Sequence, residues 1–308
     1  MSVREFVVLG TSAAAPTRQR NHNGYALRWD DQLIFFDPGE GFQRQCTHAG
    51  IAIARGDAVC ITHFHGDHCL GLPGLIARRD LDQCPDVLQI YFPAEEGELY
   101  ERLQTCTANA LEVNLDARPC AATPEPQAAG TIGRLTVEVA ALDHRVPTQG
   151  YRISEPAKRR FIPAALRAAG LKGSIVGRLK ADGTVSGPHG TVRYEDVSQP
   201  IPGQSVAFVM DTRPCRGAVS LAEGVDLLIC ESTFLESEQD LAHRYHHMTA
   251  ADAGRLAAEA GAKQLVLTHF SARYTKSEPF RAEAGRYHDN VWVAADFDRI
   301  PFRVGHSD

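Results

Sequence analysis

The chain has 308 residues, of which 44% are hydrophobic and 23% are charged, and its net charge is −6 at neutral pH. These values are typical of a globular protein and exclude a mostly disordered chain. The negative charge argues against a protein that binds nucleic acid over its whole surface. No apolar run reaches the roughly 18–20 residues that a membrane-spanning helix needs, so we expect no membrane association.

The cysteines and the first residues indicate a reducing compartment. Eight cysteines are scattered along the chain without any C-x-x-C pair. The first six residues lead directly into a strand-like run, without the basic region and cleavage site of a secretion signal. We therefore expect free thiols and a cytoplasmic location.

Short apolar runs alternate with stretches that favour helices, which is the pattern of a layered α/β fold. The runs predicted to be buried strands are 6–9, 33–36, 58–61, 206–209, 227–230 and 265–267. Residues 249–261 predict a helix, because Thr249 and Asp252 have the spacing of a capping box and Gly261 can end the helix. Segments 120–131 and 182–204 are rich in residues that interrupt regular structure and are expected to be irregular.

One segment differs strongly in charge from the rest of the chain. Residues 152–180 contain eight basic residues and one acidic residue, so this segment carries +7 and the rest of the chain carries −13. The densest cluster is 158–160, for which we expect no acidic neighbour. Such a segment is either a surface that binds a polyanion or a solvated helix face, and the tight cluster favours the polyanion.

The strongest motif is the run from His63 to His68, in which His63, His65, Asp67 and His68 surround a glycine. Residues two apart on extended backbone point to the same side, so His63 and His65 can hold one ion together. Asp67 and His68 follow on a turn or at a helix start and can hold a second. Buried imidazoles and carboxylates need partners, which argues against a purely structural role.

Three further candidates also follow predicted strands, namely His144, Asp211 and His269. Ligands at the carboxyl ends of several strands can converge on one site. Imidazoles with a carboxylate suit zinc best, with manganese and iron as alternatives.

Several other runs accompany these residues and make the pattern more specific. Residues 16–21 read P-T-R-Q-R-N, residues 39–45 read G-E-G-F-Q-R-Q, and residues 269–274 read H-F-S-A-R-Y. With the run at 63–68, they resemble the ribonuclease Z family, the tRNA 3′-processing endonucleases of the metallo-β-lactamase superfamily. The resemblance covers nearly the whole chain.

The resemblance implies an α/β fold, a four-layer αβ/βα metallo-β-lactamase-like sandwich over residues 1–308, with an inserted basic arm at 154–204. It implies two Zn²⁺ ions per subunit. One ion would be bound by His63, His65 and His144, the other by Asp67, His68 and His269, and Asp211 would bridge them.

The same resemblance implies catalytic and binding roles. Asp67 would also orient the attacking water, His247 would protonate the leaving 3′ oxygen, and Glu231 would orient His247 and raise its pKa. Precursor tRNA would be the partner, in a homodimer with residues 71–75 and the helix after them as a candidate interface. The implied substrate contacts are Arg18, Arg20 and Asn21 near the RNA 3′ end, Ser271 and Arg273 at the scissile phosphate, and Lys158, Arg159 and Arg160 in the arm.

The leading hypothesis is therefore a zinc-dependent endoribonuclease that removes 3′ trailers from precursor tRNA and leaves a 3′-hydroxyl. One alternative is a two-metal hydrolase of the same superfamily that acts on a small phosphodiester or another ester. A second alternative is an RNA-binding relative without catalysis, although a mere binding protein needs no bridging carboxylate.

Overall fold

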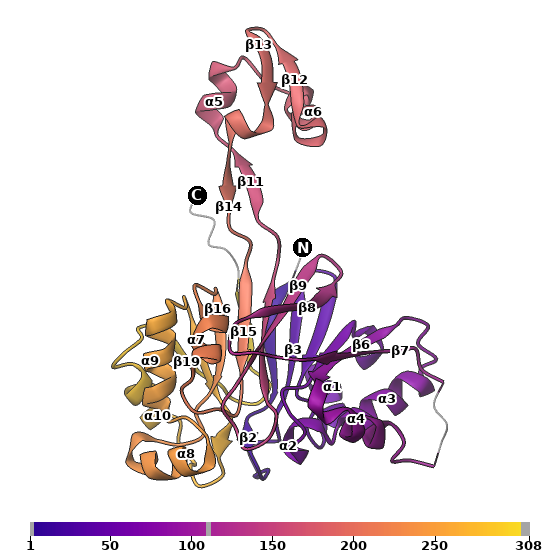
Figure 1. Cartoon of the computed structure of the whole chain (residues 1–308), viewed down its shortest axis with the longest axis vertical. Coiled ribbons are helices and arrows are strands. Elements are labelled where there is room, and N and C mark those ends of the chain that lie inside the picture. The colour runs from indigo at the N-terminus through magenta and orange to yellow at the C-terminus, as the bar shows by residue number, and fades with distance from the viewer. Residues whose placement is uncertain (1–2, 109–111, 303–308) are drawn as a thin grey trace. The chain divides into compact units, whose positions relative to one another are not determined.

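The computed structural model describes residues 3–108 and 112–302, and the chain divides into two compact units (Figure 1). The smaller unit is the continuous segment Glu155–Gln204, and the larger unit comprises the described residues on either side of it. Among the described residues no helix has both the length and the apolar character to span a membrane.

Two seven-stranded sheets form the centre of the larger unit (Figure 1). The first sheet has the order β20 (Arg299–Pro301), β1 (Arg4–Gly10), β3 (Gly24–Trp29), β4 (Gln32–Phe36), β5 (Ala58–Cys60), β6 (Leu88–Pro93) and β7 (Leu115–Cys120). The second has the order β19 (Val291–Val293), β17 (Leu265–Thr268), β16 (Leu227–Glu231), β15 (Ser205–Val209), β10 (Gln149–Ser154), β9 (Leu135–Ala141) and β8 (Gln127–Ile132). A short parallel pair joins β2 (Ser12–Ala13) to β18 (Phe270–Ser271).

Helices cover the outer face of each sheet, which produces the four layers expected from the sequence (Figure 1). The helices beside the first sheet are α1 (Phe42–Ala49), α2 (Gly66–Cys69), α3 (Leu72–Leu81) and α4 (Gly97–Gln104). Those beside the second are α7 (Arg216–Ala222), α8 (Gln239–Tyr245), α9 (Ala250–Ala260) and α10 (Glu278–Ala284). Short 3₁₀ turns lie at η1 (Ile53–Arg55), η2 (Ala94–Glu96) and η4 (Glu236–Glu238).

Three hydrophobic cores hold these layers together. The central core lies between the sheets and joins Phe36 of the first sheet to Phe208 of the second, with ring centroids 4.6 Å apart. The two outer cores join each sheet to its own helices. Because each sheet is covered on both faces, its inner strands are nearly continuous apolar runs, and this is why they could be recognised in the sequence.

The smaller unit has its own hydrophobic core, built around Leu171, Leu179, Val185 and Val197. Its ribbon contains a paired β11 (Lys158–Phe161) and β14 (Ser198–Ile201), and a hairpin of β12 (Thr184–Gly187) and β13 (Gly190–Arg193). Helices α5 (Pro163–Ala168) and α6 (Ser174–Asp182) and the turn η3 (Tyr194–Val197) complete it.

Most predicted elements are present, but two predictions were wrong. All six predicted strands form, and α9 begins after a Thr249–Asp252 capping box and ends at Gly261 in the left-handed conformation. Segment 120–131, expected to be irregular, contains most of β8, and segment 182–204 contains β12, β13 and β14. Their strands pair with partners elsewhere in the chain or across a short turn, so residue composition alone underestimated them. All eight cysteines are free, as predicted.

Candidate metal centre

The candidate ligands lie in loops that follow strands at one edge of the two sheets. His63 and His65 follow β5, Asp211 follows β15, and His269 follows β17. Both β4–β5–β6–β7 and β15–β16–β17–β19 are parallel, so the carboxyl ends of neighbouring strands lie at the same edge. Asp67 and His68 lie in the single turn of α2, which begins directly after His65.

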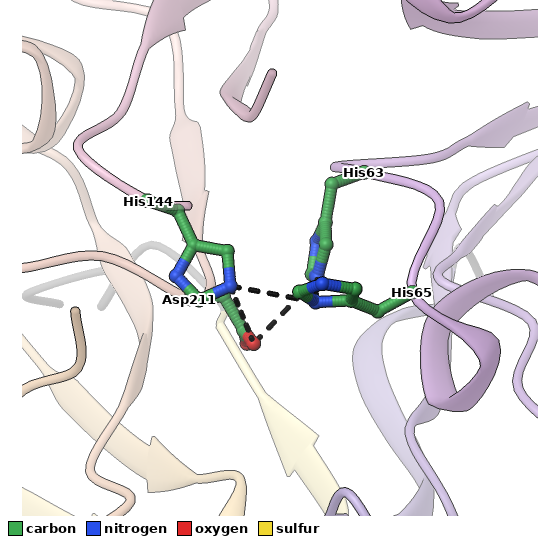
Figure 2. A group of neighbouring side chains, drawn as sticks. All are labelled: His63, His65, His144 and Asp211. Atoms are coloured by element: carbon green, nitrogen blue, oxygen red, sulfur yellow. Dashed lines mark hydrogen bonds and ion pairs between the residues drawn. The ribbon is translucent and has the colours of Figure 1, made fainter. Parts of the chain in front are cut away.

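One group of side chains consists of His63, His65, His144 and Asp211, whose ligand atoms lie within 4.8 Å of one another. Figure 2 shows His63 and His65 coming from one loop and His144 from the opposite side, with the Asp211 carboxylate between them. The Oδ2 atom of Asp211 is 3.6 Å from His63 Nε2 and 3.8 Å from His144 Nε2.

A second group contains Asp67, His68 and His269. The other carboxylate oxygen of Asp211, Oδ1, lies 3.4 Å from His68 Nε2 and 3.0 Å from His269 Nε2. Asp211 therefore directs one oxygen to each group, which is the arrangement that a bridging carboxylate requires.

The chemistry of this cluster fits divalent cations. The Oδ1 atom of Asp211 and the Nε2 atom of His269 are buried and have no hydrogen-bond partner among the described residues. Burial raises the pKa of Asp67 and Asp211, but neighbouring imidazoles outweigh this effect and hold both values well below their usual range. Buried ionised carboxylates beside converging imidazole nitrogens form a set that cations would stabilise.

A second layer of hydrogen bonds sets which ring nitrogen faces the cluster in His63, His68, His144 and His269. His68 Nδ1 donates to Asp37 Oδ2 at 2.8 Å, and His144 Nδ1 donates to the carbonyl oxygen of His246 at 3.0 Å. His269 Nδ1 lies 2.7 Å from Thr233 Oγ1, whose hydroxyl donates to Glu231. Each bond leaves Nε2 as the atom that faces the cluster, as in known metal sites.

In His63, too, the Nδ1 atom has a hydrogen-bond partner and Nε2 faces the cluster, and here the partner is a threonine. Its Nδ1 atom lies 3.0 Å from Thr62 Oγ1, and this hydroxyl donates to Asp37 at 2.7 Å. Asp37 thus supports two candidate ligands at once. No sequence pattern indicated a role for Asp37, Thr62 or Thr233, because their importance depends on which loops are adjacent in space.

The backbone is strained at several of these positions. Asp37, Asp211 and His269 have φ angles of 43°, 41° and 60°, in the left-handed region that non-glycine residues rarely occupy. Each conformation costs of the order of 1–3 kcal/mol and persists only where the surroundings enforce it. The strain therefore coincides with the candidate centre.

Gly39 allows two of the site loops to approach each other. A Cβ atom at this position would lie 2.2 Å from the carbonyl oxygen of Asp67 and 2.6 Å from that of Asn23. Both neighbours are backbone atoms, which cannot move aside cheaply.

We expect Gly39→Ala to destabilise the protein by about 1–3 kcal/mol, the usual cost of overpacking. The measurement is urea unfolding of the metal-free protein. Gly97→Ala is the matched control, since nothing lies within 4 Å of the added methyl group and Gly97 starts α4. Equal unfolding midpoints for the two variants would contradict the close approach.

His247 and Glu231 form a buried pair beside this cluster. His247 Nδ1 donates to Glu231 Oε1 at 2.9 Å, and the same oxygen accepts from the backbone N–H of Thr212. Burial lowers the pKa of His247, but the carboxylates of Glu231 and Asp211 outweigh it and raise the pKa to about 9. His247 Nε2 lies 3.9 Å from Asp211 Oδ2, and Asp211, His247 and His269 also form a third group with metal-ligand spacing.

A cavity of about 550 Å³ opens above the cluster. Its wall includes six residues that the sequence indicated as candidates, and they are His65, Asp67, Asp211, His247, His269 and Ser271. It also includes four side chains for which the sequence indicated no role, and they are Leu70, Arg145, Phe234 and Tyr245. The only sequence signal for Arg145 was its place next to His144.

The predicted substrate residues differ in their exposure and in their hydrogen-bond partners. Arg18 is exposed, whereas Arg20 donates to the carbonyl oxygen of Tyr274 at 2.9 Å and lies over the Phe270 ring. Asn21 donates from its side chain to the carbonyl oxygen of Glu40 at 2.9 Å. Arg20 and Asn21 thus hold their own loop.

Ser271 lines the cavity, and Arg273 contacts Ser271 Oγ at 3.2 Å. Arg273 also lies 3.6 Å from the carboxylate of Glu238.

The cluster at 158–160 does have an acidic neighbour, contrary to expectation. Lys158 Nζ lies 2.8 Å from Glu155 Oε2, three residues earlier in the chain. Arg159 donates to the hydroxyl and the carbonyl oxygen of Ser198, across the β11–β14 ribbon. Arg160 is exposed. The ribbon brings these partners together, and their sequence separation concealed the pairing with Ser198.

Comparison with known proteins places this geometry in context. A family model described as Anti-Pycsar protein Apyc1 matches residues 4–150. The chain is 47% identical over 302 residues to Ribonuclease Z of Nocardia farcinica, and the match covers 98% of each chain.

Two solved structures resemble the whole fold. Human tRNase Z, short form, matches with a TM-score of 0.71 at 24% identity, over 97% of this chain and 100% of that one. The metallo-β-lactamase fold protein YhfI from Bacillus subtilis matches with a TM-score of 0.70 at 19% identity, over 97% and 99% of the two chains. The predicted metallo-β-lactamase-like fold is confirmed.

Proposed function

The chain belongs to the ribonuclease Z family, and from this premise we propose that it is a metal-dependent endoribonuclease that removes 3′ trailers from precursor tRNA. The observation that carries the proposal is the single carboxylate of Asp211, which directs its two oxygens to two separate groups of imidazoles. Such a centre suits phosphodiester hydrolysis.

We further propose that two Zn²⁺ ions occupy the centre, with Mn²⁺ or iron as alternatives. His63, His65 and His144 would hold one ion, Asp67, His68 and His269 would hold the other, and Asp211 would bridge them. The imidazole-rich ligand set supports zinc. When bound, the ions lower the pKa of a water molecule towards ~7 and neutralise charge that develops on the phosphate.

The side chains of this protein then perform the proton transfers. Asp67 orients the attacking water, and His247 donates a proton to the leaving 3′ oxygen, so that the mature RNA keeps a 3′-hydroxyl. Glu231 holds His247 through Nδ1 and keeps Nε2 directed to the cavity. The raised pKa of about 9 keeps His247 protonated at neutral pH, as a general acid requires.

We propose that the smaller unit binds tRNA phosphates and therefore acts as the arm expected from the sequence. Arg160, Arg167, Lys172, Arg178 and Lys180 are all exposed. Exposed cations on a unit with its own core can contact phosphates without disturbing the metal centre.

Neutralising two of these cations should weaken RNA binding in a salt-dependent way. For Arg167→Gln with Arg178→Gln, the slope of log Kd against log salt should fall by about 1 for each phosphate that the arm no longer neutralises. The measurement is tRNA binding over a range of salt concentrations. Arg102→Gln, which removes an exposed cation of α4 that pairs with Glu98, is the control and should leave the slope unchanged. An unchanged slope in the double variant would refute the proposal that the smaller unit binds tRNA phosphates.

The alternative, hydrolysis of a small phosphodiester, needs the larger unit alone. The structure makes this testable, because Ser154 and Ser205 pair directly across β10 and β15. Residues 155–204 can therefore be replaced by a two-residue Asn-Gly turn. Loss of tRNA cleavage with retained hydrolysis of a chromogenic phosphodiester supports the tRNA function. Unchanged turnover of the natural substrate would favour the alternative.

Two further properties belong to the proposal. We expect a homodimer in which residues 71–75 and the rest of α3 form the interface, since Leu81 at the end of α3 is 75% exposed. Sedimentation at several concentrations tests this. We also expect a cytoplasmic location, which the eight free cysteines support.

The decisive experiment is cleavage of an end-labelled precursor tRNA that carries a 3′ trailer, with and without chelator. We expect one chelator-sensitive cut near the acceptor stem that leaves a 3′-hydroxyl and a 5′-phosphate on the trailer. Metal analysis of the same sample should show two ions per chain. If the precursor tRNA is not cut but a chromogenic phosphodiester is hydrolysed, the small-molecule alternative would be favoured.

A further inference from the structure

The rim of the cavity carries side chains that the mechanism above does not use. Tyr245 and Leu70 line it and are 38% and 53% exposed. Arg145 lines it as well, and its guanidinium carbon lies 5.5 Å from the centroid of the Tyr245 ring. A polar floor of imidazoles and carboxylates is thus bordered by an aromatic ring, an aliphatic side chain and a cation.

Arg145 differs from Arg20 and Arg273, two other arginines near the cavity. Arg273 lies near the carboxylate of Glu238, and Arg20 is tied to the carbonyl oxygen of Tyr274. Within residues 3–108 and 112–302, the Arg145 guanidinium forms no ion pair with a carboxylate. Its charge is therefore available to an anion, and its position directly after His144 keeps it beside the candidate metal centre.

The position of Tyr245 links the rim to the proposed general acid. Tyr245 is the last residue of α8, His246 ends the helix in the left-handed conformation with φ 59°, and His247 follows. The carbonyl oxygen of His246 also accepts the hydrogen bond from His144. Tyr245 and His247 thus lie in one short turn. The hydrogen bond from His144 joins this turn to the residue that precedes Arg145.

A cation beside an exposed aromatic ring is a common nucleotide-binding arrangement. Unstacked bases of RNA stack on aromatic rings or on arginine guanidinium planes, and arginine also contacts phosphate oxygens. An apolar ligand would gain nothing from Arg145, and a simple anion would gain nothing from Tyr245 or Leu70. The two residues together fit a nucleotide.

We propose that Arg145 and Tyr245 form a subsite for one nucleotide next to the scissile phosphodiester, with the base stacked against the Tyr245–Arg145 pair and a flanking phosphate contacting the guanidinium. The inference rests on the proposed function and deepens it. Because the turn that carries Tyr245 also carries His247, a base held there places the scissile phosphate in register with the proton donor.

The experiment combines variants with altered RNA. Precursor tRNAs are prepared with an abasic nucleotide on one side or the other of the cut, and kcat/KM is compared with that for the intact precursor. The variants are Tyr245→Ala, Tyr245→Phe and Arg145→Gln. Tyr287→Ala is the matched control, because Tyr287 is also 38% exposed and lies beside Arg255 and Arg286.

We expect Tyr245→Ala to lower kcat/KM for the intact precursor by about 5- to 100-fold, the usual effect of losing one stacked base. At one of the two abasic positions this loss should shrink to about 2-fold or less, because the base that stacks is already absent. Tyr245→Phe should behave as wild type, and Arg145→Gln should weaken every substrate. Metal content should stay unchanged in all variants.

An equal loss on intact and abasic precursors would show that Tyr245 has only a structural role and would overturn the subsite. So would wild-type activity of Tyr245→Ala on the intact precursor. A wild-type chain that fails to cleave the intact precursor would instead overturn the proposed function, so the two failures are distinguishable.

Discussion

Asp211→Asn is expected to abolish cleavage and to release divalent ions from the protein. The carboxylate lies between two groups of imidazoles and directs one oxygen to each. Asparagine keeps the shape but removes the charge and turns one ligand oxygen into a donor. Loss of an outer hydrogen-bond partner alone lowers metal affinity about 10- to 100-fold, so the loss of a carboxylate that we propose to bridge two ions should exceed this.

We expect cleavage to fall by roughly 1,000-fold or more, which corresponds to ~4 kcal/mol of barrier. The measurements are single-turnover cleavage of a precursor tRNA and metal content after dialysis. Asp296→Asn is the control, because Asp296 accepts hydrogen bonds from Thr11 and Asn21 and lies outside the ligand groups. Full metal content and activity in the Asp211 variant would refute the bridging role.

His247→Gln should slow cleavage by about 100- to 10,000-fold, the range for the loss of a general acid. The leaving 3′ oxygen of a ribose needs a proton, and glutamine cannot supply one. Metal content should stay unchanged. Glu231→Gln should produce part of the same loss, because the carboxylate both orients His247 through Nδ1 and raises its pKa.

The leaving group provides the sharper test of this role. A p-nitrophenyl phosphodiester releases an anion that needs no proton, so His247→Gln should have little effect on its hydrolysis. The rates on this ester and on precursor tRNA are compared in the same preparation. A loss of metal in His247→Gln would instead make His247 a ligand, as its grouping with Asp211 and His269 allows. Equal losses on both substrates without loss of metal would refute proton donation.

The sequence was most informative where the relevant interactions are local. The run from His63 to His68 places four chemical groups within six residues, and β5 followed by α2 presents them together. The capping box of α9 is likewise a contact between residues three apart. The sequence also indicated three further candidates, His144, Asp211 and His269, because each follows an apolar run. That their side chains lie close together depends on how the strands are arranged in the sheets, and the sequence alone could only predict it.

The sequence was least informative where pairing is distant. The strands β8 and β14 lack strong apolar patterns and form because they pair with β9 and β11. The partners of Arg159, Arg20 and Asn21 lie on other loops or strands. No local pattern indicates such contacts, since they depend on the register of strands far apart in the chain.

The sequence by itself therefore determined the family, the layered α/β fold and the chemical type of the centre, because buried apolar runs and a dense ligand motif are local features. Only the tertiary structure decided which ring nitrogen of His63, His68, His144 and His269 faces the cluster, through Asp37, Thr62, Thr233 and the carbonyl oxygen of His246. It alone brought Arg145 beside Tyr245 at the cavity rim. The physical reason is that a hydrogen bond or a stacked contact depends on positions within a fraction of an ångström, and these follow from the packing of two whole sheets.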